Sequence, residues 1–283
     1  MRPYKILLFI TILSLFIACD NDENNSEEPS LENFIFKDGF ETENNSINEL
    51  FPSDMSRWTT IQQTNPTNVT NEISIINSEF SEGHNALRIF SHQSDTQLSK
   101  MDIEKNGLRF KKGDKITITA DFFINGTQSL ENLILIDLES CSCWDPSVGD
   151  NYGSENQCPG IRLIMSGGND FLSIERGKIS GTTLQQTNMA FPRNQWVSIL
   201  WEITLSDDVN GLNRLVINGT EVINENAMNM PNAQVFADIF ANEGINFTLQ
   251  EPVIYERVQI GATANPTAGN IELFVDNFKI EME

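Results

Sequence analysis

Two carboxylates lie two residues apart in the apolar segment Leu133–Glu139. If this segment is a strand, Asp137 and Glu139 share a face, with Cα atoms roughly 6.5–7 Å apart. That spacing suits paired acid/base catalysis on a glycosidic bond, which needs carboxyl groups about 5–9.5 Å apart. The alternative is that both are ordinary solvent-facing residues of a half-exposed strand. The spacing alone leaves both interpretations open.

Polar and aromatic residues that follow this segment could complete a catalytic or binding set. A base beside a cation can abstract a proton next to a uronate carboxylate, and Tyr152 with Arg162 or Arg176 would supply both groups. The catalytic candidates are Asp137, Glu139, Tyr152, Glu175 and Arg176. Trp144 and Tyr152 add rings on which a sugar can stack. The carbohydrate-binding candidates, which we expect around one face of a sheet, are Asp137, Glu139, Trp144, Tyr152, Arg162, Glu175 and Arg176.

Three cysteines, Cys141, Cys143 and Cys158, fall among these candidates. In an oxidising compartment we expect one disulfide, from Cys158 to Cys141 or to Cys143. A bridge between Cys141 and Cys143 is less favoured, because strand residues i and i+2 lie too far apart for easy bridging. A zinc site is the alternative, although the sequence offers no evident fourth ligand. The bridge would close the loop that carries Trp144 and Tyr152, for which a purely structural role is the alternative.

The N-terminus has the pattern of an export signal. Arg2 and Lys5 precede an apolar run from residue 6 to 17, which is too short to cross a bilayer comfortably. The residues Leu-Phe-Ile-Ala-Cys that end at Cys19 resemble the bacterial lipobox, in which the cysteine is acylated as the signal is removed. We expect residues 1–18 to be a lipoprotein signal peptide and Cys19 to be lipidated. An ordinary secretory signal with an incidental cysteine is the alternative.

Residues 19–33 are rich in Asp, Asn and Glu and cannot bury a core. We expect them to form a solvated tether between the lipid and one large domain over residues 34–283. An acidic stretch in this place resembles the signal that sends some Gram-negative lipoproteins to the outer face of the outer membrane, and a spacer with no address is the alternative. The sequence therefore predicts an outer-membrane location, facing the cell exterior.

The chain is strongly acidic, with a formal net charge of −22 at pH 7. This charge repels polyanions, so nucleic acid and strongly sulfated glycans are unfavourable partners. A bound calcium ion would soften the repulsion. No EF-hand-like loop is present in the sequence.

Short runs with period-two alternation recur between turn residues, which predicts an all-β protein. The expected strands are Ile116–Ile124, Leu133–Glu139, Ile161–Met165, Phe171–Arg176, Trp196–Leu205, Leu212–Ile217, Val258–Ala262 and Ile271–Ile280. Alternation places Val197, Ile199, Trp201, Ile203 and Leu205 in the core. It likewise places Ile134, Ile136 and Leu138 in the core, with Asp137 and Glu139 on a wet face. Residues 224–246 are the least strand-like and could hold a short helix or a long loop.

Three groups of motifs resemble the concanavalin A-like jelly rolls. They are Phe-Lys-Asp-Gly-Phe-Glu at 36–41 with Gly-His-Asn-Ala-Leu-Arg at 83–88, Trp196 followed by Val-Ile-Asn-Gly at 216–219, and Phe-Val-Asp-Asn-Phe-Lys-Ile at 274–280. The resemblance covers nearly the whole domain and implies a two-sheet antiparallel β-sandwich. It implies little about function, because the superfamily contains polysaccharide lyases, family 16-like glycoside hydrolases, laminin G-like modules and lectins.

The resemblance also implies a glycan site on the wet face of the larger sheet, and a calcium site for which Asp38 and Asp276 are weak candidates. The acidic motif of family 16-like hydrolases and the strand motifs of alginate-type lyases are absent from the sequence. We therefore expect a surface lipoprotein that binds extracellular polysaccharide. A polysaccharide lyase or glycoside hydrolase with an unfamiliar catalytic set is the first alternative, and a structural or adhesive surface module is the second.

Overall fold

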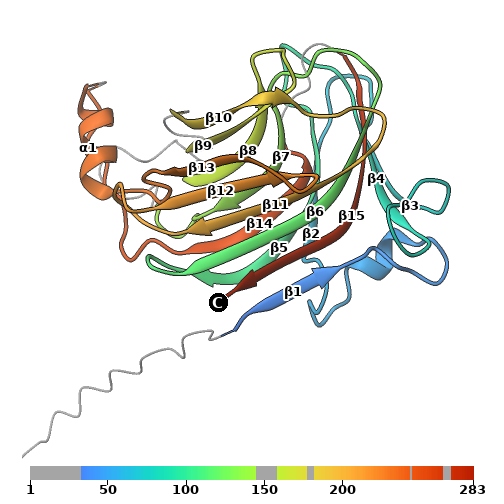
Figure 1. Cartoon of the computed structure of the whole chain (residues 1–283), viewed down its shortest axis with the longest axis horizontal. Helices are drawn as coiled ribbons and strands as arrows, with labels where there is room; N and C mark the ends of the chain where they lie inside the picture. Colours follow the sequence, from blue (N-terminus) through green and yellow to red (C-terminus); the bar gives the residue numbers. More distant parts are fainter. Residues whose placement is uncertain (1–32, 145–157, 177–181, 243, 264–268) are drawn as a thin grey trace, which may run out of the picture. The chain divides into compact units, whose positions relative to one another are not determined.

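The computed structural model describes residues 33–144, 158–176, 182–242, 244–263 and 269–283. These residues belong to one compact unit, built from two antiparallel β-sheets that pack as a sandwich (Figure 1). The predicted all-β class and two-sheet sandwich are confirmed. Residues 1–32, which contain the expected signal, Cys19 and nearly all of the tether, lie outside the described residues.

The first sheet has eight strands. In spatial order they are β13 (Thr220–Asn226), β12 (Leu212–Ile217), β11 (Trp196–Thr204), β6 (Lys115–Asn125), β15 (Ile271–Met282), β4 (Ala86–Ser91) and β3 (Glu72–Ile76), with β1 (Ile35–Asp38) also paired to β15. The connection from β12 to β13 is the Asn218-Gly219 turn, where both residues have positive φ.

The second sheet has seven strands and carries the predicted site residues that the structure describes. In spatial order they are β10 (Thr182–Ala190), β9 (Phe171–Arg176), β8 (Gly160–Ser166), β7 (Leu133–Glu139), β14 (Tyr255–Ala262), β5 (Lys100–Phe110) and β2 (Thr60–Thr64). The predicted bounds of β7, β9 and β12 coincide with the observed ones.

The core lies between the two sheets. Val197, Ile199, Trp201, Ile203 and Leu205 are all buried, as their alternation predicts. From the second sheet, β5, β14 and β7 contribute apolar residues that pair across the ladder, such as Ile103 with Ile260 and Ile260 with Ile136. One face of the second sheet is therefore apolar and packs in the core, and the other is its outer face.

Strand β7 departs from simple alternation. In its pairing with β8, Ile134 lies opposite Ile164 and Ile136 lies opposite the next residue, Leu163. Leu135 is therefore an extra residue in this register. Such a β-bulge reverses the facing of the residues beyond it. Ile136 lies on the core face as predicted, but Ile134 pairs with Ile164 on the outer face. Ile134 is buried, as predicted, with 3% of its surface exposed, but the bulge places it on the other face of the strand from Ile136.

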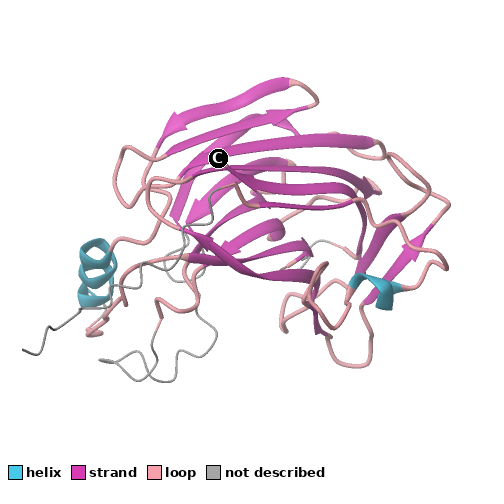
Figure 2. Ribbon diagram, turned by 90° about the horizontal axis from the view of Figure 1, so that it is seen from below, coloured by secondary structure: helices cyan, strands magenta, loops and turns pink. Residues whose placement is uncertain are grey.

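Two helical segments flank the strands (Figure 2). The α-helix α1 spans Ala233–Asn242, inside the segment predicted to hold a short helix or a loop, and a 3-10 helix spans Ile47–Leu50. Helix α1 packs Phe236 and Phe240 against Trp144, Phe247 and Leu249 in a second apolar cluster. Within the described part of the chain, no helix is long and apolar enough to cross a membrane.

Candidate functional site

A row of polar side chains crosses the outer face of the seven-stranded sheet. Each strand contributes one residue, and neighbours in the row are direct partners in the strand register: Thr60, Glu104, Gln259, Asp137, Arg162, Glu175 and Thr183. Residues directly opposite in a ladder share a face. Six interstrand spacings of about 4.8 Å give the row a length of about 29 Å.

Further polar residues flank this row on the same face, because they lie two or four positions away along their strands. They are Gln62 on β2, Lys100 and Asp102 on β5, Arg257 on β14 and Glu139 on β7. We call the row and these five residues together the polar face. Among its members are five carboxyl groups and three cations, and most of the carboxyl groups are buried.

Arg257 links two buried carboxylates at the centre of the polar face. Its Nε donates to Glu139 Oε2 at 2.6 Å and lies 3.4 Å from Glu104 Oε2. The amide of Gln259 donates to the same two carboxylates, at 2.9 Å each. The side chains of Glu139 and Glu104 are 0% and 3% exposed, and that of Arg257 is 23% exposed. Buried carboxylates are tolerated here because a guanidinium and an amide satisfy them.

Asp102 has a weaker partner. Lys100 Nζ lies 3.4 Å from Asp102 Oδ2, and the same ammonium also contacts Gln62 and Gln259. Burial raises the pKa of Asp102 to about 8, because desolvation outweighs the attraction of Lys100 and because Glu104 and Asp137 add repulsion. At neutral pH most Asp102 side chains are therefore protonated and can donate a hydrogen bond.

The row becomes more accessible toward β10. Arg162 Nη2 lies 3.7 Å from Glu175 Oε2, and the two side chains are 13% and 12% exposed. The Thr183 hydroxyl donates to Glu175 Oε1 at 3.1 Å, and Thr183 is exposed. Asp137 lies between this pair and the central network, 1% exposed. The prediction that Asp137 and Glu139 face solvent is wrong, although both lie on the outer face of the sheet.

A disulfide joins Cys141 to Cys158 beside the polar face. It is one of the two pairings that the sequence left open. Gly160, two residues after Cys158, pairs with Glu139, and a Cβ there would lie 2.2 Å from the carbonyl oxygen of Leu138. Strand β8 can therefore approach β7 this closely only with glycine at that position.

The disulfide also bears on the zinc site that the sequence left as an alternative. Among the described residues, the one group of three potential metal ligands within reach of each other is Glu139, Cys141 and Cys158. The two sulfurs are bonded to each other, so this group does not form a thiolate zinc site. The remaining thiol, Cys143, is buried and donates to the carbonyl oxygen of Ser140 at 2.9 Å. Burial raises the pKa of Cys143 to about 11, which keeps it a protonated, unreactive thiol.

Two candidates lie away from the polar face. Arg176 follows Glu175 directly and therefore points to the other face of β9, where it pairs with Ile161 and lies 5.4 Å from the Phe236 ring. The expectation that Arg176 shares a face with Glu175 is wrong, because consecutive strand residues alternate. Trp144 is 9% exposed and packs against Phe247 at 4.8 Å between ring centroids. It is part of the apolar cluster under α1, so the expectation that Trp144 offers an exposed ring for sugar stacking is wrong.

The weak calcium candidates already have partners. Asp38 binds Arg57 through both carboxylate oxygens, at 2.8 and 2.5 Å. Asp276 accepts backbone N–H groups of Ser81, Glu82 and Asn277 at 2.7–3.0 Å. The guanidinium at Asp38 stands where a cation would bind, which disfavours a site there. Tyr152, the remaining candidate, lies outside the described residues.

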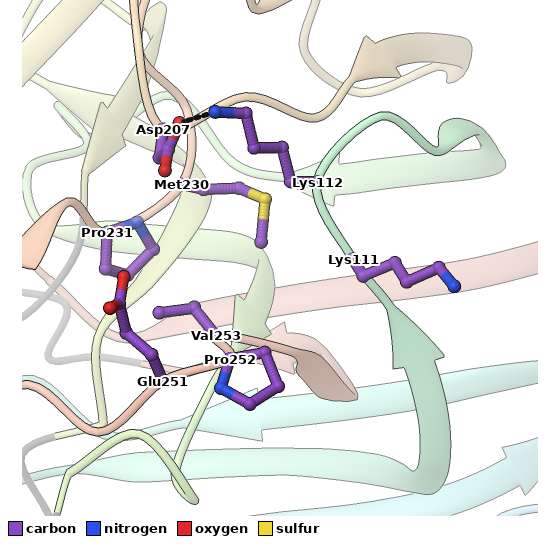
Figure 3. Close-up of a pocket in the computed structure, with 8 residues that line it drawn as sticks. All are labelled: Lys111, Lys112, Asp207, Met230, Pro231, Glu251, Pro252 and Val253. Atoms are coloured by element: carbon purple, nitrogen blue, oxygen red, sulfur yellow. Dashed lines mark ion pairs between the residues drawn. The ribbon is translucent and has the colours of Figure 1, made fainter. Parts of the chain in front are cut away.

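A separate pocket of about 480 Å³ opens beyond the end of β5 (Figure 3). Met230, Pro231, Pro252 and Val253 make it mainly apolar, and the ion pair between Lys112 and Asp207 lies at its rim, at 2.5 Å. None of its lining residues belongs to the polar face. The polar face, with its convergent charges and the raised pKa of Asp102, is the stronger candidate for a functional site.

Several members of the polar face were missed by the sequence analysis: Gln62, Lys100, Asp102, Glu104, Arg257 and Gln259. A signal for β5 was available, since Lys100, Asp102 and Glu104 alternate with the apolar Met101 and Ile103. Their position on the same face as Asp137 and Glu139, with β14 between, depends on the order β7-β14-β5, which joins strands far apart in the chain. Local patterns do not specify that order.

Comparison with known proteins shows the fold. No family model and no curated protein matches the sequence. An endo-β-1,4-glucuronan lyase from the fungus Trichoderma reesei is similar in structure with a TM-score of 0.54 and 11% identity, over 79% of this chain and 90% of that one. An alginate lyase is similar with a TM-score of 0.51 and 9% identity, over 87% and 96% of the two chains. These similarities support the jelly-roll-like sandwich.

Proposed function

We propose that this chain binds an extracellular polysaccharide along the polar face. The observation that carries the proposal is the row of seven polar residues, one from each strand, across the outer face of the sheet. A line of about 29 Å suits a polymer better than a single sugar. The glucuronan and alginate lyases that share the fold act on polysaccharides, which agrees with this proposal.

The energetics of the polar face also support a functional role. Replacing a buried ion pair with well-packed apolar residues is often neutral or stabilises a protein by about 1–4 kcal/mol. The network of Arg257 with Glu104 and Glu139 is therefore a poor way to stabilise a sheet. Clustered buried charges with a perturbed pKa, as at Asp102, are typical of functional sites.

Sugar hydroxyls can both donate and accept hydrogen bonds, and the polar face offers partners for both. The partly exposed Arg162 and Lys100 would donate to hydroxyl oxygens, and Glu175 would accept from hydroxyl groups. Because Arg162 and Glu175 lie at the more open end of the row, we place the strongest contacts with the polysaccharide there.

The test compares two double variants that each replace one arginine and one glutamate that form an ion pair. Arg162→Met with Glu175→Gln removes the pair on the polar face, and Arg214→Met with Glu202→Gln removes a pair on the outer face of the other sheet. Affinity electrophoresis in gels that contain single polysaccharides measures retention. We expect the first double variant to lose retention and the second to keep it. Equal retention of both would contradict the proposed site and favour a structural or adhesive surface module.

A second candidate function is hydrolysis of the bound glycan. Asp102 and Glu104 lie two apart on β5 and share the polar face, and a raised pKa keeps Asp102 protonated at neutral pH. Glycoside hydrolysis uses a pair of carboxyl groups, one of which is held protonated to act as the acid. If the chain is catalytic, Asp102→Asn should abolish release of reducing ends while binding persists. Release of unsaturated uronate products would instead indicate a lyase.

We also propose that the protein is held at the outer membrane, facing the exterior, through lipid on Cys19. The lipobox-like residues that end at Cys19 and the acidic residues that follow support this location. Several acyl chains together give stable anchoring. A polysaccharide-binding domain at the cell surface would then meet its ligand directly.

A further inference from the structure

The cations of the polar face are already paired. Arg257 contacts Glu139 and Glu104, Lys100 contacts Asp102, and Arg162 contacts Glu175. Within the described polar face, no cation lacks a carboxylate partner. Arg109, exposed near the end of β5 beyond the register shift of that strand, is not a member of the polar face.

The polar face carries more carboxyl groups than cations. Its carboxyl groups are Asp102, Glu104, Asp137, Glu139 and Glu175, and its cations are Lys100, Arg162 and Arg257. Protonation of Asp102 at neutral pH, a consequence of its burial, reduces the excess of negative charge but does not reverse it. The chain as a whole carries a formal charge of −22. The local and the long-range fields therefore both oppose an anionic polymer.

We propose that the polar face takes an uncharged polysaccharide and excludes polyuronates, because the carboxylates of the face itself hold its cations. The inference depends on the proposed polysaccharide-binding function and specifies its ligand class. A uronate carboxylate placed in the row would have to displace Glu175 from Arg162, or Glu139 from Arg257. Uncharged hydroxyl groups can join the existing ion pairs without displacing either partner.

The size of the discrimination follows from the cost of like charges. Placing like charges against each other across an interface costs several kcal/mol. Each 1.4 kcal/mol corresponds to a factor of ten in affinity. We therefore expect the purified chain to bind a neutral β-glucan, xylan or mannan at least about ten-fold more tightly than alginate or polyglucuronate.

A single substitution should change this selectivity. Glu175→Gln removes the carboxylate that lies 3.7 Å from Arg162 and so makes its guanidinium more available to a uronate. A hydrogen bond to a charged group contributes about 1.5–3 kcal/mol, so affinity for polyglucuronate should rise at least about ten-fold. Glu202→Gln removes the same charge from the outer face of the other sheet but leaves Arg214 paired with Glu221, so it is a control for net charge and should gain nothing.

Salt provides a second measurement. Raising the salt from about 0.1 M to about 1 M shortens the Debye length from about 10 Å to about 3 Å. Binding of the neutral polysaccharide by the wild-type chain should change little, whereas the polyuronate binding gained by Glu175→Gln should be largely lost. Thermal unfolding of each variant checks that the fold is intact.

The outcomes separate this inference from the proposed function. Wild-type binding of a polyuronate as tight as that of any neutral polysaccharide would overturn the inference and leave the proposed function standing. A folded Glu175→Gln variant without gain for polyuronates would also overturn it, because pairing would then not be what excludes them. A wild-type chain that retains no polysaccharide of either class would reject both.

Discussion

Asp102 makes the stability of this protein depend on pH in a way that a single substitution should remove. Its pKa is about 8 in the folded chain against an ordinary value of 3.8, because burial outweighs the attraction of Lys100. A carboxyl group with a raised pKa binds its proton more tightly in the folded state. Its contribution to stability is therefore fully present below about pH 4 and declines as the pH rises toward 8.

The magnitude follows from the difference between the two pKa values. In the window where only the unfolded chain has lost the proton, stability falls by about 1.4 kcal/mol for each pH unit. Between pH 5 and pH 7 the wild-type chain should lose about 3 kcal/mol relative to Asp102→Asn, and the whole window corresponds to at most about 6 kcal/mol. The variant cannot ionise at this position, so its stability does not fall with pH for this reason.

Urea denaturation at pH 5, 6, 7 and 8 measures the free energy of unfolding of both chains, with equal m-values as the check that they unfold alike. The curves of stability against pH should diverge as the pH rises, with wild type losing stability relative to Asp102→Asn. Lys100→Met removes the ammonium that favours ionised Asp102, so it should extend the decline to higher pH. Ser198→Ala, an exposed substitution on the other sheet, should keep the wild-type slope. Parallel curves for wild type and Asp102→Asn would refute the reasoning.

Three further predictions concern the central ion pairs, the disulfide and the lipid anchor. Arg257→Met leaves two buried carboxylates without their cation and should cost about 3–5 kcal/mol, seen as a fall in Tm of about 6–20 °C, and an unchanged Tm would contradict the buried network. Replacing Cys141 and Cys158 by serine opens a loop of sequence separation 17 and should cost about 3 kcal/mol in urea denaturation under non-reducing conditions, and reduction should then have no further effect. Cys19→Ser should abolish metabolic labelling with palmitate and release the protein from membranes, and continued labelling would reject the lipobox interpretation.

Much of the fold could be predicted because alternation is a local property. The bounds of β7, β9 and β12 and the buried residues of β11 follow from which residues can face an apolar core. Seven observed strands were not among the expected ones: β1, β2, β3, β4, β5, β10 and β13. Four of these, β2, β3, β10 and β13, lie at the ends of their sheets. Edge strands carry more polar residues and show weaker alternation.

The site was predicted only in part, because its members come from strands that are distant in sequence. Asp137, Glu139, Arg162 and Glu175 were identified, and the structure brings them onto one face. Burial of Glu139 depends on Arg257 and Gln259, which no local pattern links to β7. The bulge at Leu135 and the packing of Trp144 under α1 are likewise tertiary features.

On the proposed function, the pairing that neutralises the buried carboxylates of the polar face also limits what this face can bind. A sheet can bury Glu104 and Glu139 only if a cation neutralises them, and Arg257 does so at the centre of the row. A cation used in this way cannot also neutralise a carboxylate of the ligand unless the ligand replaces the protein carboxylate. A jelly-roll face that handles polyuronates therefore needs cations in excess of its own carboxylates, whereas this face has the opposite balance. Within one fold, the ratio of paired to unpaired cations on the outer face of the sheet can thus decide whether the polymer it accepts is charged.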